Sequence, residues 1–185
     1  MFNYNFNQNN ANPKSNNFCG GYALAAIFNT IHNMQLNMPN PQNVYNNIQN
    51  NQVGVGINSQ NLIQNTQINN TDISLPSSIA IAALQNNLIP IVIHGNTPFL
   101  QAVILEEINR IQAQAINIVQ NNMNLNQVLL AQNENYFIVL VNMGQHWIAI
   151  EKLKNNIFNI YDPGTGLITN NLAAINYSGI IIAMH

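Results

Sequence analysis

Charged side chains are scarce in this chain of 185 residues, whose four Lys or Arg and six Asp or Glu give a charged fraction of 5% and a net charge of −2. Ordinary domains carry about 25% charged residues. So few cations cannot neutralise a run of phosphates, and they cannot form a basic face for a membrane surface. Partners recognised by positive charge, nucleic acids among them, are therefore excluded.

Long apolar runs are also absent. No stretch is long enough to span a bilayer, and the first residues, MFNYNFNQNN, have neither the basic head nor the apolar core of a signal peptide. We expect no membrane span, and a protein that is cytoplasmic or secreted without a cleaved signal peptide.

Neutral amides replace the missing charges, since Asn and Gln make up roughly three residues in ten. An AT-rich genome would account for Asn and Ile but not for the scarcity of Lys. One explanation is an effector or toxin inside a host cell, where few lysines leave few ubiquitination sites; neutral drift of the surface is the alternative. Low charge also weakens the repulsion between copies, which leaves self-association open.

Only one cysteine is present, which excludes an internal disulfide and a zinc site with paired Cys ligands. An isolated cysteine is usually a small buried hydrophobe. Cys19, however, lies where a Gly-Gly pair opens a helical pattern, and backbone N–H groups and the helix dipole favour a thiolate there. Gly20 and Gly21 would also let a substrate backbone approach closely. We expect neither a cofactor nor a metal ion.

Hydrophobic residues form 47% of the chain and occur along its whole length, which predicts a single domain over residues 1–185. We expect residues 1–17 to form an extended Asn-rich arm that lies on the body of the domain. Apolar patterns predict helices and strands. The helices are expected at 19–32, 41–51, 77–87 with a Ser cap, 98–119 with the only Glu pair on its polar face, and more weakly 126–133. The strands are expected at 88–95, 136–143, 146–153, 156–163 and 177–185.

Helices come first in this order and most strands come last, which favours an α+β fold. We expect the N-terminal helices, including the one that begins at Cys19, to pack against a C-terminal antiparallel sheet.

Two of the expected strands bring a histidine and a carboxylate together. His146 begins one strand and Asp162 ends the next, sixteen residues later. A hairpin centred near Lys154 would place the two side by side. A two-residue turn at Asn155–Asn156 would shift the register by about three residues, so a bulge or a longer turn is implied. A carboxylate on one imidazole nitrogen leaves the other free to take a thiol proton.

The remaining titratable residues lack such a relation. His32, His94 and His185 have no carboxylate nearby in sequence and are interpreted as structural, and Asp72 lies in a loop. Adjacent Glu106–Glu107 would point apart on a helix, which disfavours a hydrolase with paired carboxylates.

Two motifs carry a family resemblance. The segment FCGGYALAAIF resembles the Cys-Gly helix start of papain-like peptidases, in particular the bacteriocin-processing peptidases that cut after double-glycine leaders. The segment HWIAIEKLKNNIFNIYDPGTG resembles the His strand, hairpin and Asp-Pro-Gly segment of the same family, in the same order. The resemblance implies a papain-like fold, with Cys19 as nucleophile, His146 as general base and then acid, and Asp162 as the orienting group.

The family also has an oxyanion donor, usually a Gln about six residues before the Cys. Pro13 stands at that position here. Asn12 is the nearest amide that could replace it, and the other amides in reach are Gln8, Asn16 and Asn17. The backbone N–H of Cys19 would be the second donor.

The triad predicts a cysteine peptidase that cleaves a polypeptide substrate through an acyl-enzyme thioester. Glutamine deamidation, transglutamination or another acyl transfer uses the same triad and thioester and is the first alternative. A self-associating structural protein without catalytic activity is the second.

Overall fold

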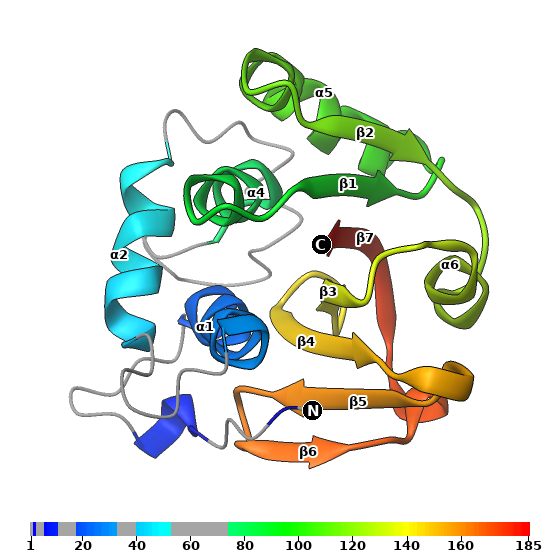
Figure 1. Ribbon diagram of the computed structural model, residues 1–185. Coiled ribbons are helices and arrows are strands. Elements are labelled where there is room, and N and C mark those ends of the chain that lie inside the picture. The colour runs from blue at the N-terminus through cyan, green and yellow to red at the C-terminus, as the bar shows by residue number, and fades with distance from the viewer. Residues whose placement is uncertain (1, 3–5, 11–17, 33–39, 53–73) are drawn as a thin grey trace.

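The computed structural model describes residues 2, 6–10, 18–32, 40–52 and 74–185, which form a mixed α+β fold (Figure 1). Its helices are α1 (Cys19–His32), α2 (Pro41–Asn50), α4 (Pro76–Gln85), α5 (Pro98–Ala113) and α6 (Leu125–Ala131), with 3-10 helices η1 (Gln8–Asn10), η2 (Lys154–Asn156) and η3 (Leu172–Ala174). Its strands are β1 (Pro90–His94), β2 (Asn117–Gln120), β3 (Tyr136–Val141), β4 (His146–Lys152), β5 (Phe158–Asp162), β6 (Leu167–Thr169) and β7 (Tyr177–Met184).

The seven strands form one sheet in the order β2-β1-β7-β3-β4-β5-β6. Neighbouring strands from β1 through β7 to β6 are antiparallel, whereas β1 and β2 are parallel and are connected by α5. A parallel pair needs such a crossover, since a tight turn can join only antiparallel strands. The α+β prediction is therefore confirmed, and the sheet also includes strands from the middle of the chain.

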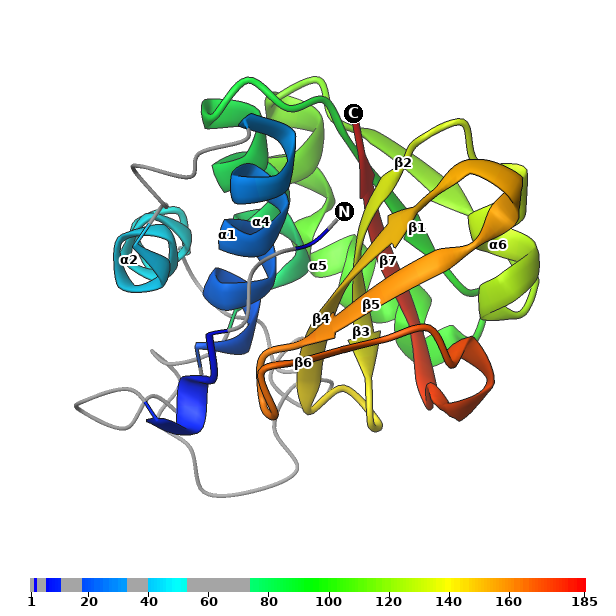
Figure 2. The ribbon, with the colours of Figure 1, turned by 60° about the horizontal axis from the view of Figure 1, so that its bottom comes forward.

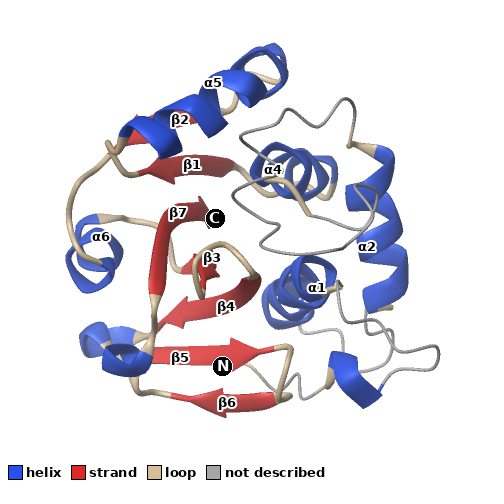
Figure 3. Ribbon diagram, turned by 180° about the vertical axis from the view of Figure 1, so that it is seen from behind, coloured by secondary structure: helices blue, strands red, loops and turns tan. Residues whose placement is uncertain are grey.

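Two hydrophobic clusters cover the two faces of the sheet. Helices α1, α4 and α5 pack on one face, where Trp147 and Tyr161 belong to the cluster. Helix α6 packs on the other face, with Ile148 and Ile160. Successive residues of a strand point to opposite faces, so neighbours in β4 and β5 enter different clusters. Figures 2 and 3 show the sheet between α1 and α4 on one side and α6 on the other, with α2 outermost.

The turn between β4 and β5 is longer than two residues, as predicted. Residues 154–156 connect the strands as η2, and the Leu153 N–H donates to the Ile157 carbonyl at 2.7 Å. Asn155 and Asn156 have φ angles of 61° and 56°. Asn tolerates this left-handed region better than most residues, so the Asn pair suits the turn.

The observed register of this hairpin differs by two residues from the predicted one. A hairpin centred near Lys154 would pair Ala149 with Asn159, whereas the structure pairs Ala149 with Tyr161. Side chains alternate with a period of two, so a shift of two leaves every residue on its original face. His146 and Asp162 are therefore diagonal neighbours on one face, a separation that long side chains can bridge.

Helix α5 is shorter than the prediction of 98–119. It ends at Ala113, because Ala115 adopts a left-handed conformation with φ 56°. The Ile116 N–H then donates to the Ile111 carbonyl at 3.2 Å, which closes a Schellman motif. Glycine is the residue that usually occupies a left-handed position after a helix, so Ala115 did not indicate a helix end in the sequence. The apolar residues after Ala115, which had been assigned to the helix, lead into strand β2.

The Ser cap predicted for the third helix is wrong. Helix α4 begins at Pro76, and its N-cap residue Leu75 makes no side-chain cap. The cap comes from Glu107 of α5, whose Oε2 accepts the Ser77 N–H at 2.7 Å. Glu107 is therefore buried, not on the polar face of its helix, whereas Glu106 is exposed. A carboxylate at this point stabilises the positive end of the α4 dipole.

We expect Glu107→Ala to lower the free energy of unfolding by about 1–3 kcal/mol, since a buried N–H would lose its acceptor. Glu106→Ala, on the adjacent exposed position, should change it by less than about 0.5 kcal/mol. Urea unfolding of both variants measures the difference. Equal effects of the two substitutions would show that Glu107 does not act as the cap of α4.

Candidate active site

Cys19 is the first residue of α1, and contacts of Phe18 hold this end of the helix against α2. The Tyr22 N–H donates to the Phe18 carbonyl at 2.9 Å, which begins the helix, and the Phe18 ring stacks on Tyr45 of α2 at a centroid distance of 3.9 Å. Cys19 is 6% exposed. Its backbone N–H lies in the first helical turn, where N–H groups have no acceptor within the helix.

The glycines after Cys19 serve a different purpose from the one expected. A Cβ atom on Gly20 would lie 2.6 Å from the Ser74 side chain, and one on Gly21 would lie 2.6 Å from Cβ of Tyr45. Such distances are shorter than carbon atoms tolerate. The glycine pair therefore lets neighbouring segments pack against the start of α1, and the room predicted for a substrate backbone is already filled.

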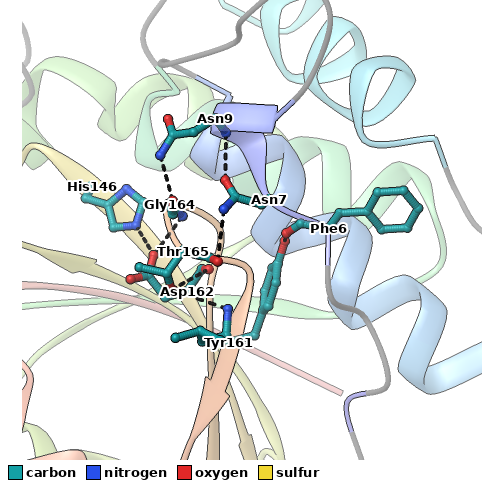
Figure 4. Close-up of polar contacts among 9 residues, drawn as sticks. Phe6, Asn7, Asn9, His146, Tyr161, Asp162, Gly164 and Thr165 are labelled. Atoms are coloured by element: carbon teal, nitrogen blue, oxygen red, sulfur yellow. Dashed lines mark hydrogen bonds and ion pairs between the residues drawn. The ribbon is translucent and has the colours of Figure 1, made fainter.

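His146 and Asp162 form a direct hydrogen bond. The His146 Nε2 lies 2.7 Å from Oδ1 of Asp162, and the same carboxylate oxygen accepts the Gly164 N–H at 2.8 Å (Figure 4). The second contact is the Asx turn that an Asp-Pro-Gly sequence favours. A Cβ on Gly164 would lie 3.2 Å from that oxygen, so a glycine also lets the turn lie close to the pair.

Cys19 is the second neighbour of the His146 ring. The hydrogen bonding and the charge of its thiol are among the causes that raise the pKa of the imidazole. Because Asp162 occupies Nε2, Nδ1 is the ring nitrogen left for the sulfur. The structure thus brings together Cys19, His146 and Asp162, the three residues selected from the sequence, from α1, β4 and β5.

The two partners change the protonation of His146. Burial by itself lowers the pKa of the imidazole, but the hydrogen bonds and charges of Asp162 and Cys19 outweigh it and raise this pKa from 6.5 to about 10. A raised pKa means that the charged ring stabilises the fold fully below pH 6.5 and that this contribution is lost as the pH rises through about 10.

The pKa of Asp162 moves in the opposite direction. Burial raises it, but the hydrogen bond and charge of His146 and the contacts of Gly164 and Thr165 prevail and lower it from 3.8. Its contribution to stability is present above pH 3.8 and is lost as the pH falls through the lowered value. Across the neutral range the pair therefore exists as imidazolium and carboxylate.

Residues 6–9, the described part of the expected N-terminal arm next to the site, bind the turn that carries Asp162. The Tyr161 hydroxyl donates to the Phe6 carbonyl at 2.7 Å, and the Gln8 N–H donates to the Pro163 carbonyl at 3.0 Å. The side chain of Asn7 donates to the Thr165 carbonyl at 3.0 Å and that of Asn9 to the Gly164 carbonyl at 2.6 Å (Figure 4).

These four bonds join residues 6–9 to residues 161–165, so the arm orients the Asp162 turn from outside the site. Sequence analysis did not identify Asn7, Asn9 or Gly164. The Asp-Pro-Gly pattern could have identified Gly164 through its turn chemistry. Nothing local could have identified Asn7 and Asn9, because their partners lie about 155 residues away.

The oxyanion donor proposed at Asn12 lies outside the described residues, as do Pro13, Asn16 and Asn17. Gln8, the remaining amide considered for this role, is described and is buried at 5% exposure in η1.

The other described histidines lie apart from the thiol. His94 is buried, with Nδ1 2.8 Å from the Gly95 carbonyl oxygen, and His32 is exposed at the end of α1. Nδ1 of His185 lies 3.6 Å from Oε1 of Glu134, a carboxylate that is close in space although it is far away in sequence. Within the described ranges, no three His, Cys, Asp or Glu side chains are grouped to hold a metal ion. No helix in those ranges has both the length and the apolar character to cross a membrane.

Comparison with known proteins gives no match to a family model, to a curated protein or to a solved structure.

Asp162→Asn should lower the pKa of His146 from about 10, because the variant removes the carboxylate charge while the burial of the ring persists. NMR titration of the imidazole protons measures this shift. Glu106→Gln removes an exposed carboxylate from α5 and should leave the His146 pKa unchanged. A His146 pKa that stays near 10 in Asp162→Asn would contradict the assigned cause.

Replacement of both arm amides, Asn7→Ala with Asn9→Ala, should lower the free energy of unfolding by about 1–3 kcal/mol, since each hydrogen bond contributes about 0.5–1.5 kcal/mol. The His146 pKa should also fall, because the turn that presents Asp162 loses two of its anchors. Asn109→Ala, on the exposed side of α5, is the control. A double variant that loses stability but keeps the His146 pKa would show that the arm does not orient Asp162.

Proposed function

We propose that this chain is a papain-like cysteine hydrolase that cleaves peptide bonds. One observation carries the proposal: a single imidazole, that of His146, is hydrogen-bonded to the Asp162 carboxylate and is close enough to the Cys19 thiol for that thiol to raise its pKa. A nucleophile, a base within hydrogen-bond reach and a third group that orients the base are the requirements of nucleophilic acyl transfer. The start of α1 next to an antiparallel sheet agrees with the resemblance found in the sequence.

In the proposed first half-reaction, the thiol proton of Cys19 is held on Nδ1 of His146, and the sulfur attacks the substrate carbonyl carbon so that an S–C bond forms as the carbonyl π bond breaks. The carbonyl oxygen becomes an oxyanion, which the Cys19 N–H would stabilise at the helix start. The C–N bond then breaks, and the His146 imidazolium donates its Nδ1 proton to the leaving amine. The product is a thioester, with neutral His146 held in place by Asp162.

In the second half-reaction, water attacks the thioester carbon while His146 Nδ1 takes a proton from the water. The C–S bond breaks, the carboxylic acid product leaves, and the sulfur departs as a thiolate beside the restored imidazolium. Glutamine deamidation begins with the same thioester and releases ammonia instead of an amine, and transfer reactions replace water by another acceptor. Because the first half-reaction is common, the acceptor and the leaving group decide among these reactions.

A role as an effector or toxin belongs to this proposal as its biological setting. The scarcity of Lys supports it, because few ubiquitination sites would prolong the life of such an enzyme in a host cell.

Iodoacetamide should alkylate Cys19 at pH 6 at least about ten-fold faster than it alkylates free cysteine, whose thiol is almost entirely protonated there. His146→Ala should abolish the excess rate, since the group that takes the thiol proton is removed. The matched control is His32→Ala, on an exposed histidine at the other end of α1. Mass spectrometry of the alkylated peptide gives the rate. A wild-type rate equal to that of free cysteine, unaffected by His146→Ala, would exclude the whole class of thiol enzymes.

The same proposal predicts new peptide termini when the protein is incubated with a cell lysate, and none with Cys19→Ala. Conversion of Gln to Glu without new termini would assign the site to deamidation and contradict the peptidase. Terminal labelling followed by mass spectrometry distinguishes the two products.

A further inference from the structure

Cys19 and His146 come from different layers of the protein, and the proposed reaction needs them at a fixed separation. Cys19 begins α1, whereas His146 begins β4. A thiol is a weak hydrogen-bond donor, so its contact with an imidazole does not hold a helix and a strand in register. Proton transfer is nevertheless sensitive to displacement, and an error of about 1 Å can slow such a step about 100-fold. Other residues must therefore fix the distance between the two elements.

The residue next to His146 bonds to the segment that precedes α4. The Trp147 Nε1–H donates to the Ser74 carbonyl at 2.9 Å, and this bond is buried. Trp147 itself is 1% exposed. An indole has one donor and no acceptor, and a buried donor without a partner is costly, so the Ser74 carbonyl fixes the position of the ring. Because the ring belongs to the residue directly after His146, the bond holds the start of β4 relative to Ser74.

Ser74 also packs on the residue next to Cys19. A Cβ atom on Gly20 would lie 2.6 Å from both Cβ and Oγ of Ser74, so the Ser74 side chain lies directly against the Gly20 backbone. Ser74 is 2% exposed, and its Oγ has no hydrogen-bond partner among the described residues. The contact with α1 therefore depends on close packing, whereas the contact with β4 depends on the backbone carbonyl.

Helix α4 holds Ser74 in place. Ser74 precedes Leu75, the N-cap residue of α4, whose carbonyl accepts the Ile79 N–H at 3.0 Å. The Leu75 N–H donates to Oε1 of Gln52 at 3.4 Å. Helices α1 and α4 lie side by side next to β4 (Figure 3). Ser74 is thus anchored where the starts of two helices meet the strand of His146.

We propose that Ser74 and Trp147 are positioning residues of the thiol site: Ser74 bonds to the strand of His146 and packs on the helix of Cys19, and this link keeps the sulfur and the imidazole within reach of each other. The inference rests on the proposed function, because the separation matters only if His146 takes the thiol proton. Neither residue is required to touch the substrate. Both act through the elements that carry Cys19 and His146.

Trp147→Phe tests the bond to β4, because it keeps an aromatic ring in the core and removes the N–H donor. At pH 6, alkylation of Cys19 by iodoacetamide in the full chain should slow at least about ten-fold relative to the wild type. The His146 pKa, measured by NMR titration, should also fall, because a thiol that moves away raises it less while the bond to Asp162 remains.

The packing contact has a test of its own. Gly20→Ala should slow the same alkylation about ten-fold, because the added methyl group collides with Ser74 and pushes the two segments apart. Combining Gly20→Ala with Ser74→Gly removes the colliding atoms. The double variant should recover a rate within about three-fold of that of Ser74→Gly alone.

Lys152→Met is the control, at the opposite end of β4. The Lys152 Nζ donates to the carbonyls of Leu129 and Gln132 at 3.1 and 2.8 Å, so this variant loses bonds from the same strand at the end remote from His146. It should lower the urea concentration at the midpoint of unfolding, but it should leave the alkylation rate and the His146 pKa at their wild-type values.

The outcomes separate the two proposals. Trp147→Phe with the wild-type alkylation rate and His146 pKa, or Lys152→Met with losses as large as those of Trp147→Phe, would overturn the positioning role and leave the enzyme class standing. A defect of Gly20→Ala that Ser74→Gly does not relieve would overturn the part assigned to Ser74. A wild-type rate equal to that of free cysteine would overturn the proposed function and the positioning role with it.

Discussion

The burial of α1 is the constraint on which the rest of the structure depends. Every residue from Cys19 to Asn29 is buried, so this helix has no face that water can cover and must be enclosed on all sides. The sheet, α2 and α4 provide that enclosure. Enclosure also brings the first turn of α1 to the end of the sheet, and this places a thiol next to the histidine of β4. The candidate site therefore results from the packing of the sheet, α2 and α4 around α1.

Three carboxylates in the described part of the chain each bind a specific partner. Glu107 caps α4 from inside the protein, and Glu151 accepts the Phe2 N–H at 3.0 Å where the arm begins. Asp162 alone among them bonds to the histidine that contacts the thiol. In a protein with few competing charges, Asp162 and Cys19 together raise the pKa of His146 and keep its imidazole protonated in the neutral range.

Local patterns predicted the elements well and their ends less well. The start of α1 and four strands of the last third follow from apolar spacing, which short-range geometry determines. The end of α5 was missed because Ala115 takes a conformation that Gly usually signals, and the cap of α4 was missed because Glu107 reaches it from another helix. Strand β6, only three exposed residues long, offered no apolar alternation to detect.

The sequence alone determined that Cys19, His146 and Asp162 are available in that order and that the last two share one face, because side-chain alternation preserves the face through an even change of register. Tertiary structure decided which imidazole nitrogen of His146 bonds to the carboxylate. It also decided that Ser74 and Tyr45 occupy the space beside the two glycines after Cys19. The bonds from Asn7 and Asn9 to the Asp162 turn likewise depend on it. These features join residues far apart in the chain. Propensity and periodicity act over a few neighbouring residues, whereas such contacts arise only when the whole core has closed.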